Sequence, residues 1–203
     1  MGDIRFYKLL IWINGLLPIG LMVVDWSRGR LGANPIEFFL RATGVMTLVF
    51  LALTLSVTPV RSRFGLNQLI KYRRLLGLFA FFYASVHLLT YSVFDKDLSL
   101  AAIAADVMQR PFIAIGMAAF ALLIPLAITS TKGWVKRLGG KRWARLHKLT
   151  YVVAVLGVVH FWMIVKSDIF YPVIFGLIIG VLLAYRLRPL FVSDRKQTVL
   201  TKP

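Results

Sequence analysis

The chain has 203 residues, of which 59% are hydrophobic and 16% charged, and its mean hydropathy is +0.76. This composition excludes a soluble domain, which needs more polar surface, and a disordered chain, which has low hydrophobicity. The absence of cysteine excludes disulfides, iron–sulfur ligation and thiolate zinc sites. We therefore expect a polytopic membrane protein, in which about 20 apolar residues make one span.

Six apolar stretches predict an all-α bundle of six transmembrane helices. In chain order they cover residues 9–24, 38–59, 75–94, 111–130, 149–165 and 169–187. The first stretch is short and contains a proline, Pro18, so it is the least regular of the six. Only three residues separate the last two stretches, which predicts that they are antiparallel neighbours. The expected organisation is a short N-terminal segment over 1–8, the six-helix domain over 9–190 and a tail over 191–203.

The net charge of +17 is distributed unevenly along the chain. The segments that fall on one face of the six-span arrangement contain 19 of the 25 lysines and arginines but only two of the eight acidic residues; they are 1–8, 61–74, 131–148 and 186–203. The positive-inside tendency makes that face cytoplasmic and places both termini inside. This topology accounts for the charge without a nucleic acid partner, and the basic face is expected to contact anionic membrane lipid.

Three histidines are the candidate ligands of a metal or cofactor. His87 lies in the third stretch, about 13 residues past the Arg73–Arg74 pair, and His160 lies in the fifth stretch, 13 residues past His147. His87 and His160 should therefore share one depth toward the outer face. Two imidazoles from two helices at one depth suit axial ligation of a haem iron. The alternative is that each histidine only hydrogen-bonds a neighbouring helix.

The expected inner level contains one imidazole, His147, and the guanidinium groups of Arg73 and Arg74. Guanidinium groups do not ligate iron, but they bind phosphate and carboxylate well. The inner site is expected to hold a phosphate-bearing cofactor, or a haem with one weak or missing axial ligand. In the alternative interpretation, Arg73 and Arg74 are ordinary basic residues of the cytoplasmic face.

A series of short motifs, in a fixed order over residues 9–190, carries a resemblance to a known family. The motifs are Gly15-Leu-Leu-Pro18, Leu31-Gly-Ala-Asn-Pro35, Thr54-Leu-Ser-Val-Thr-Pro59, Arg73-Arg-Leu-Leu-Gly77, His87-Leu-Leu-Thr-Tyr91, Arg110-Pro-Phe112, Thr129-Ser-Thr131 and Arg145-Leu-His-Lys-Leu-Thr-Tyr151, followed by His160. The chain resembles the MsrQ (YedZ) family of haem-binding membrane subunits of bacterial methionine sulfoxide reductase systems. That family is part of the ferric-reductase-like transmembrane group.

The resemblance implies an electron-transfer subunit of the bacterial inner membrane, as opposed to a catalytic subunit. It implies haem b and FMN as cofactors, and quinol or a cytosolic flavin reductase as the electron donor. The implied acceptor is a periplasmic molybdopterin-containing methionine sulfoxide reductase that repairs oxidised envelope proteins. By the same resemblance, His87 and His160 match the outer haem ligands, and His147 matches the inner histidine. The wider group has a second histidine where this chain has Arg74, which leaves room for a flavin in place of a second haem.

Two other functions stay open at this stage. One is a transmembrane ferric or cupric reductase, in which metal ions take electrons at the outer face. The other is a transporter or structural bundle without a cofactor, in which all three histidines are merely packed. The sequence has no recognisable flavin–nicotinamide or molybdenum domain, so we expect the electron-transfer subunit to need a partner on each face.

Overall fold

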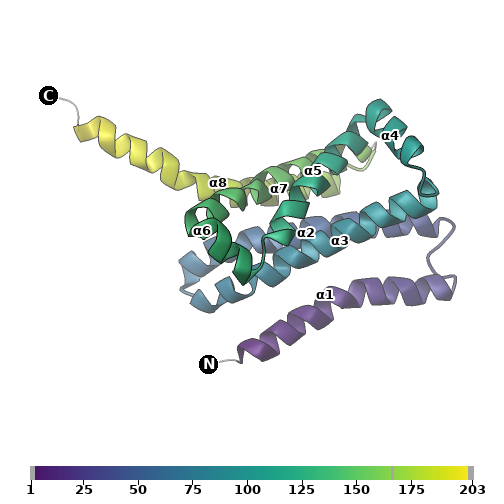
Figure 1. Cartoon of the computed structure of the whole chain (residues 1–203), viewed down its shortest axis with the longest axis horizontal. Helices are drawn as coiled ribbons and strands as arrows, with labels where there is room; N and C mark the ends of the chain where they lie inside the picture. Colours follow the sequence, from purple (N-terminus) through teal and green to yellow (C-terminus); the bar gives the residue numbers. More distant parts are fainter. Residues whose placement is uncertain (1–2, 166, 201–203) are drawn as a thin grey trace.

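The computed structural model describes residues 3–165 and 167–200, and over these ranges the chain is helical without any strand (Figure 1). The α-helices are α1 (Ile4–Ser27), α2 (Pro35–Phe64), α3 (Arg73–Thr90), α4 (Leu100–Gln109), α5 (Pro111–Ile128), α6 (Lys132–Leu146), α7 (Leu149–Ile164) and α8 (Phe170–Leu200). A 3₁₀ turn, η1 (Asn67–Lys71), precedes α3, and a π-helical turn, η2 (Tyr91–Asp95), extends it. The all-α prediction is confirmed.

Four to five membrane spans can be identified among the described residues. The helices α1, α2, α5 and α3 with η2 are long and apolar enough to cross a bilayer, and α6 with α7 adds a fifth span if their 42° bend is a break within one span. The apolar part of α8, Phe170–Arg186, is shorter. A sixth span and the cytoplasmic location of both termini stay predictions. The first turns of α1 and the last turns of α8 lie at the same end of the bundle (Figure 1), as an even number of crossings requires.

Two helices occupy segments that we expected to be loops. The helix α4 begins after Ser99, whose side chain accepts a hydrogen bond from the backbone N–H of Ala102, and its alanine-rich sequence favours a helix. The helix α6 begins after Thr131, which caps it in the same way, and Gly139 interrupts it with a φ of 71°. Hydropathy did not reveal either helix, because a capped helix can form without a long apolar run.

The helices also extend beyond the expected spans. The helix α1 already begins at Ile4, inside the expected N-terminal segment 1–8, and α8 continues to Leu200, well past residue 187. Most of the expected tail 191–203 is therefore helical backbone, and residues 201–203 lie outside the described part of the chain. Apolar composition marks the part of a helix suited to the hydrocarbon core, and the helix itself ends where its backbone is capped or broken.

The basic segments lie together at one end of the bundle. The turn between α2 and α3 and the helix α6 lie at the left of Figure 1, whereas α4 and the turn between α1 and α2 lie at the right. We call these the inner end and the outer end. The uneven charge along the sequence thus becomes a separation of charge in space. The inner end is the face that the positive-inside tendency predicts to be cytoplasmic.

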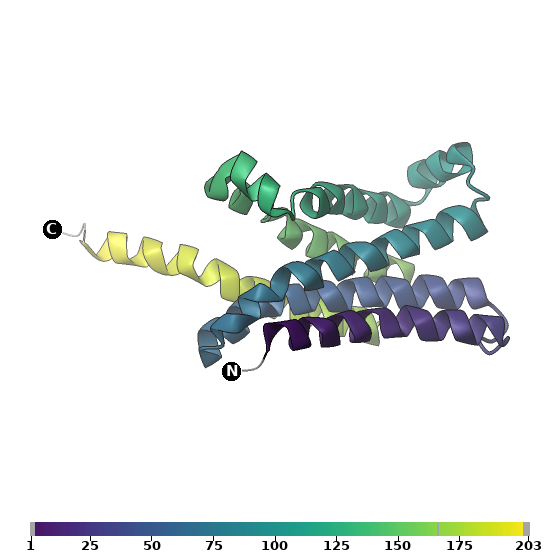
Figure 2. The same cartoon turned by 60° about the horizontal axis from the view of Figure 1, so that its bottom comes forward.

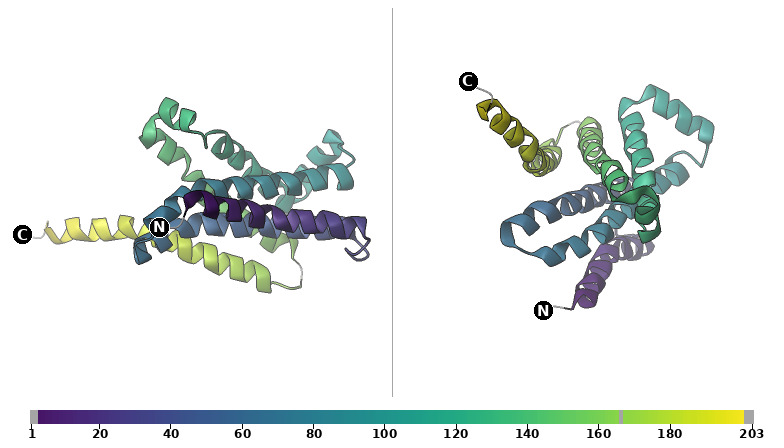
Figure 3. Two further views of the ribbon diagram at one scale, coloured as in Figure 1. Left: turned by 90° about the horizontal axis from the view of Figure 1, so that it is seen from below. Right: turned by 60° about the vertical axis from the view of Figure 1, so that its left-hand side comes forward.

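Two antiparallel helix pairs form the centre of the bundle. The helix α2 packs along α3, α5 packs along α7, and α3 contacts α5 (Figures 1 and 2). The helix α8 lies against α2 and α7, while α1 contacts α3 on the other side (Figure 3). As a result, α3 and α7, which contain His87 and His160, both lie inside the bundle.

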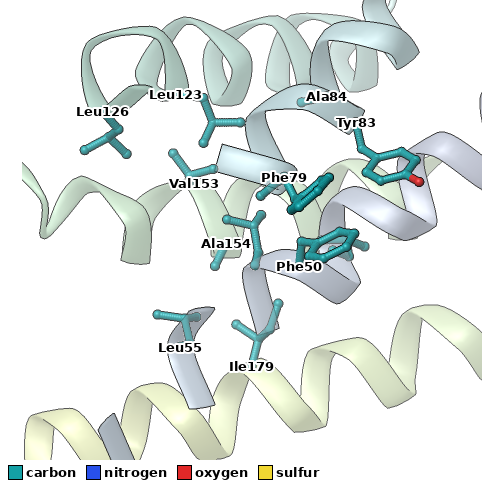
Figure 4. Packing of buried hydrophobic residues seen from close by; sticks show 13 residues of the cluster. Phe50, Leu55, Phe79, Tyr83, Ala84, Leu123, Leu126, Val153, Ala154 and Ile179 are labelled. Atoms are coloured by element: carbon teal, nitrogen blue, oxygen red, sulfur yellow. The ribbon is translucent and has the colours of Figure 1, made fainter. Parts of the chain in front are cut away.

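An apolar core fills the space between these helices (Figure 4). Phe50 of α2 stacks on both Phe79 and Tyr83 of α3, with ring centroids 5.1 and 5.6 Å apart. The Tyr83 hydroxyl donates a hydrogen bond of 2.7 Å to the backbone carbonyl of Gly15, which ties α1 to α3. The core is completed by residues of α2, α3, α5, α7 and α8, namely Leu48, Leu51, Leu55, Ala80, Ala84, Leu123, Leu126, Val153, Ala154 and Ile179.

A carboxylate fastens α4 to the outer end of α3. Asp106 is 8% exposed, and it accepts hydrogen bonds from the ammonium group of Lys96 at 2.7 Å and from the hydroxyl of Tyr91 at 2.9 Å. Arg110 lies 3.6 Å from its other oxygen. The Lys96 ammonium group holds the pKa of Asp106 below its usual value of 3.8, with smaller contributions from Tyr91 and Arg110. A carboxyl group with a lowered pKa stabilises the fold at neutral pH, and this contribution is lost as the pH falls through the lowered pKa.

Replacing Asp106 with asparagine should loosen the loop 96–99, which joins η2 to α4, at neutral pH. The change removes the negative charge that holds Lys96, so trypsin should cleave after Lys96 several times faster than in the unmodified protein. Asp168→Asn is the matched control, because it removes the same charge from another exposed loop and leaves the residues around the Lys96 cleavage site unchanged. Equal cleavage rates for the two variants, followed by mass spectrometry, would show that Asp106 does not hold the loop.

Candidate functional site

His87 of α3 and His160 of α7 lie side by side in the outer half of the bundle. Their ring centroids are 6.1 Å apart, and the ring planes are nearly perpendicular at 89°. Both side chains are partly buried between helices. The equal depth that we expected from the sequence therefore corresponds to direct proximity of the two imidazoles.

Each of these imidazoles is held by a backbone carbonyl of a neighbouring helix. The Nδ1 atom of His87 lies 2.9 Å from the carbonyl oxygen of Leu40 in α2, and that of His160 lies 2.6 Å from the carbonyl oxygen of Phe112 in α5. A carbonyl oxygen can only accept, so each Nδ1 carries the proton and donates. Each Nε2 then has a lone pair, and among the described residues neither Nε2 has a hydrogen-bond partner. A backbone bond that fixes the tautomer and orients the ring is typical of metal-ligating histidines.

The two holding sites share one local arrangement in which a glycine follows the accepting carbonyl by four residues. Gly44 follows Leu40, and Gly116 follows Phe112. Residues four apart lie on the same face of a helix, so each imidazole packs over the glycine and reaches the carbonyl one turn earlier. A Cβ atom at Gly44 would lie 3.4 Å from the His87 ring, and one at Gly116 would lie only 2.8 Å from the His160 ring. Gly116 therefore needs a residue without a side chain, whereas a Cβ atom at Gly44 would make only an ordinary contact with the ring.

His147 occupies a separate position at the inner end, where α6 meets α7. Its ring stacks on Trp143 with centroids 4.0 Å apart, and its Nε2 lies 3.1 Å from the hydroxyl oxygen of Thr129 at the end of α5. The Thr129 hydroxyl donates its own proton to the carbonyl of Pro125 at 2.6 Å, so it accepts from the imidazole. In this arrangement Nε2 carries the proton and the lone pair is on Nδ1. His147 is thus the Nε2-protonated tautomer, whereas the two outer histidines are Nδ1-protonated.

The two arginines that we expected at the inner level have different surroundings. Arg73, the first residue of α3, is partly buried and lies within electrostatic range of His147, Tyr151 and Arg186. Arg74 is exposed. Of the two, only Arg73 shares the environment of His147.

Reasoning from the sequence missed several residues that shape these sites. Gly44 and Gly116 make room for the outer imidazoles, and Thr129 and Trp143 hold the inner one. A glycine four residues after an apolar residue is too common in membrane helices to point to a ligand by itself. Arg186 was counted only as one of the inner basic residues, although it lies inside the bundle with three hydrogen bonds.

Comparison with known proteins places this geometry in a family. The family model of the ferric reductase like transmembrane component matches residues 40–158, which include His87 and His147, and His160 lies two residues beyond the end of the match. The chain belongs to the ferric-reductase-like transmembrane family.

Three relatives carry the name protein-methionine-sulfoxide reductase heme-binding subunit MsrQ. The one from Herminiimonas arsenicoxydans is 52% identical over 91% of this chain and 85% of its own length. The relative from Rhodospirillum rubrum is 48% identical over 91% of this chain and 89% of its own length. The relative from Ralstonia nicotianae is 45% identical over 91% of this chain and 86% of its own length.

These relatives cover nearly the whole of the described bundle, so the chain is a member of the MsrQ branch of this family. The membrane-spanning helices and the family membership together make it a multi-pass protein of the bacterial inner membrane. The resemblance inferred from the ordered motifs is confirmed.

The His87–His160 pair fits a haem with two axial histidines. Two metal–nitrogen bonds of about 2 Å each, added to the distance from each nitrogen to its ring centre, give roughly 6 Å between centroids, and the observed separation is 6.1 Å. Among the described residues, no group of three or more histidine, aspartate or glutamate side chains could hold a metal ion without further ligands. A haem needs only axial ligands from the protein, because the porphyrin supplies the others.

Proposed function

We propose that the chain is the haem-binding, electron-transfer subunit of a protein-methionine-sulfoxide reductase system. In this proposal, electrons from quinol or a cytosolic flavin reductase enter at the inner end and leave at the outer end. The acceptor is a periplasmic molybdopterin-containing reductase that repairs methionine sulfoxide in envelope proteins. The names of the relatives, which call them heme-binding subunits of such a reductase, support the system and the haem.

One observation carries the proposal: two imidazoles from two helices lie with their ring centroids 6.1 Å apart, and neither Nε2 has a hydrogen-bond partner among the described residues. The bonds to the Leu40 and Phe112 carbonyls keep both protons on Nδ1. Neither Nε2 atom is sealed inside the fold, so both lone pairs are accessible to a ligand. One haem iron held by both nitrogens would use both lone pairs.

The residues of the chain have distinct tasks in this function. A bound haem b supplies an iron that changes reversibly between two oxidation states. His87 and His160 would hold this iron, and their hydrogen bonds to the Leu40 and Phe112 carbonyls would keep the rings from turning. Rings held in this way would allow the iron to change its oxidation state without an exchange of ligands. The apolar core packed around Phe50, Phe79 and Tyr83 fills the space between the helices that carry the two sites.

The two ends of the bundle suit different partners. The inner end carries seven basic residues and no acidic residue between positions 131 and 148, six of them in α6, and can attract an anionic donor protein or flavin. For the inner site we propose His147 and Arg73 as the cofactor-binding residues, with FMN or a second haem as the cofactor. Arg74, which the sequence suggested together with Arg73, is exposed.

The decisive measurement is an absorption spectrum of the detergent-purified protein, first oxidised in air and then reduced with dithionite, with cofactor extraction from the same sample. A Soret band that sharpens on reduction, with split α and β bands, would establish a low-spin b-type haem. Extracted FMN would assign the inner site to a flavin. Absence of haem from cells that supply enough of it would overturn the proposal in favour of a bundle without a cofactor.

Replacing His147 with alanine should affect the inner site alone. His147 makes its hydrogen bond with Thr129 and its ring contact with Trp143, and it has no contact with either outer histidine. We expect the outer haem spectrum to be unchanged, while the content of FMN or second haem falls at least about tenfold, the effect of losing roughly 1.4 kcal/mol. Loss of the outer haem in this variant would show that the two sites are not separate.

The same preparation can separate the proposed relay from a transmembrane ferric or cupric reductase. A relay should pass electrons to a periplasmic reductase subunit faster than to Fe(III) or Cu(II) chelates. Faster reduction of the chelates by the dithionite-free, quinol-reduced protein would favour the metal reductase.

A further inference from the structure

Arg186 lies inside the inner half of the bundle and is held by three oxygens of two other helices. Its Nη2 donates to the carbonyl of Leu55 at 2.8 Å and to the hydroxyl of Thr58 at 3.2 Å, both in α2. Its Nη1 donates to the hydroxyl of Tyr151 in α7 at 2.9 Å, and the guanidinium group also lies over the Tyr151 ring, 5.2 Å from the centroid. The position of this guanidinium group is therefore fixed by the fold.

A proline explains one of these bonds. Pro59 lies within α2 and has no N–H, so it cannot donate to the carbonyl of Leu55, which lies four residues earlier. Nη2 of Arg186 takes the place of the missing donor. Part of the role of Arg186 is therefore structural, and any test of a second role has to separate the two.

Among the described residues, this structural role leaves one donor of Arg186 without a hydrogen-bond partner and its charge without a counter-ion. The Nε atom of Arg186 is buried and has no hydrogen-bond partner in the described part of the chain. The three oxygens that it contacts are all neutral. None of the ion pairs among the described side chains involves Arg186, and all of them lie toward the outer end of the bundle.

A second guanidinium group increases the unbalanced charge at this place. Arg73 is partly buried at the start of α3, and its charge and that of Arg186 repel each other. Bringing two like charges together in a poorly hydrated region is unfavourable unless an anion lies between or beside them. Guanidinium groups bind carboxylates and phosphates with strong, charge-assisted hydrogen bonds.

We propose that Arg186, together with Arg73, binds an anionic carboxylate or phosphate group at the inner end of the bundle. Arg186 offers its buried Nε–H to this anion while its other nitrogens stay bonded to α2 and α7. The inference rests on the proposed function in that the anion belongs to the inner cofactor, as a haem propionate or the phosphate of FMN; a phospholipid headgroup is the other source of the same chemistry.

The test compares Arg186→Gln with a variant in which the structural role has been made unnecessary. Replacing Pro59 with alanine gives α2 its missing N–H, so Leu55 no longer needs a donor from α8. In Pro59→Ala/Arg186→Gln the helix is intact and only the guanidinium group is lost. Arg142→Gln is the matched control, because Arg142 is an exposed residue of the inner basic helix α6.

Each full-length protein is purified in mild detergent, and its total haem, extracted FMN and tightly bound phospholipid are measured per polypeptide. We expect one of these three contents to fall by about tenfold in Arg186→Gln, in Arg73→Gln and in the double variant, but not in Arg142→Gln. The content that falls identifies the source of the anion: the second haem, the flavin or the lipid. The outer haem, recognised by its low-spin spectrum, should stay at the level of the unmodified protein.

Two results would overturn the proposal. One is that all three contents are unchanged in Arg186→Gln. The other is that a loss in Arg186→Gln is fully recovered in Pro59→Ala/Arg186→Gln, which would make the role of Arg186 purely structural. A different result, absence of the outer haem from the unmodified protein, would contradict the proposed function, and the lipid measurement would still decide whether Arg186 binds an anion.

Discussion

Replacing His160 with alanine should remove the outer haem from the purified protein, and replacing His87 should do the same. Each histidine provides one of only two protein ligands, so the loss of either leaves the iron with one axial bond and opens its other face. Even residues that only orient a ligand change metal affinity by about 10–100-fold. We therefore expect haem occupancy at this site to fall by more than about tenfold, with any residual haem in a high-spin form.

The measurement is the dithionite-reduced minus air-oxidised spectrum, normalised to protein. Val159→Ala is the matched control, because Val159 is the neighbour of His160 in α7 and is 38% exposed on the outside of the bundle. A sharper version uses His160→Gly, in which imidazole added to the growth medium and buffers should restore the low-spin spectrum. Full low-spin haem in both His87→Ala and His160→Ala would show that the ligand assignment is wrong.

Replacing Gly116 with alanine should displace His160 although Gly116 is not itself a ligand. The new methyl group would lie 2.8 Å from two atoms of the imidazole ring, which is too close for a Cβ carbon that makes no bond to that ring. Overpacking of this kind costs about 1–3 kcal/mol, whereas alanine in an ordinary helix position is about 1 kcal/mol more favourable than glycine. We expect a loss of low-spin haem of about tenfold together with little loss of helix content.

Alanine substitutions at two other glycines, Gly44 and Gly180, provide graded comparisons for Gly116→Ala. At Gly44 the added methyl group would lie 3.4 Å from the His87 ring, an ordinary contact distance, and at Gly180 of α8 no atom lies within 4 Å. The loss of low-spin haem should therefore be largest for Gly116→Ala, smaller for Gly44→Ala and absent for Gly180→Ala. The reverse order, or an equal loss in all three, would mean that the glycines do not act through the histidine rings.

The membrane-embedded part of the fold was predictable because it depends on composition. A run of apolar residues is favourable in lipid whatever its neighbours are, and the excess of basic residues on one side reflects the same bilayer. Helix ends were less predictable: α1 starts before residue 9, α8 continues to Leu200, and α4 and α6 were not expected. These helices depend on caps such as Ser99 and Thr131, which act over one turn and leave no trace in the hydropathy.

The outer pair of the candidate site was predictable from spacing, since two histidines at the same distance from the inner face of two helices must lie at one depth. The inner site was predictable only in part. Arg73 and Arg74 are neighbours in the sequence, but a helix turns by about 100° per residue. One of them therefore lies inside the bundle near His147 and the other is exposed.

By itself the sequence determined that this protein is a helical membrane protein of the ferric-reductase-like family, with His87 and His160 at one level. Only the tertiary structure decided how the imidazoles are held: Leu40 and Phe112 keep both Nδ1 protons in place, and Gly44 and Gly116 leave room for the rings. Only the tertiary structure likewise brought Arg186 to Leu55 of α2 and to Tyr151 of α7. The physical reason is that burial in lipid is a property of each segment alone, whereas a hydrogen bond between helices depends on how two distant segments are rotated and positioned against each other.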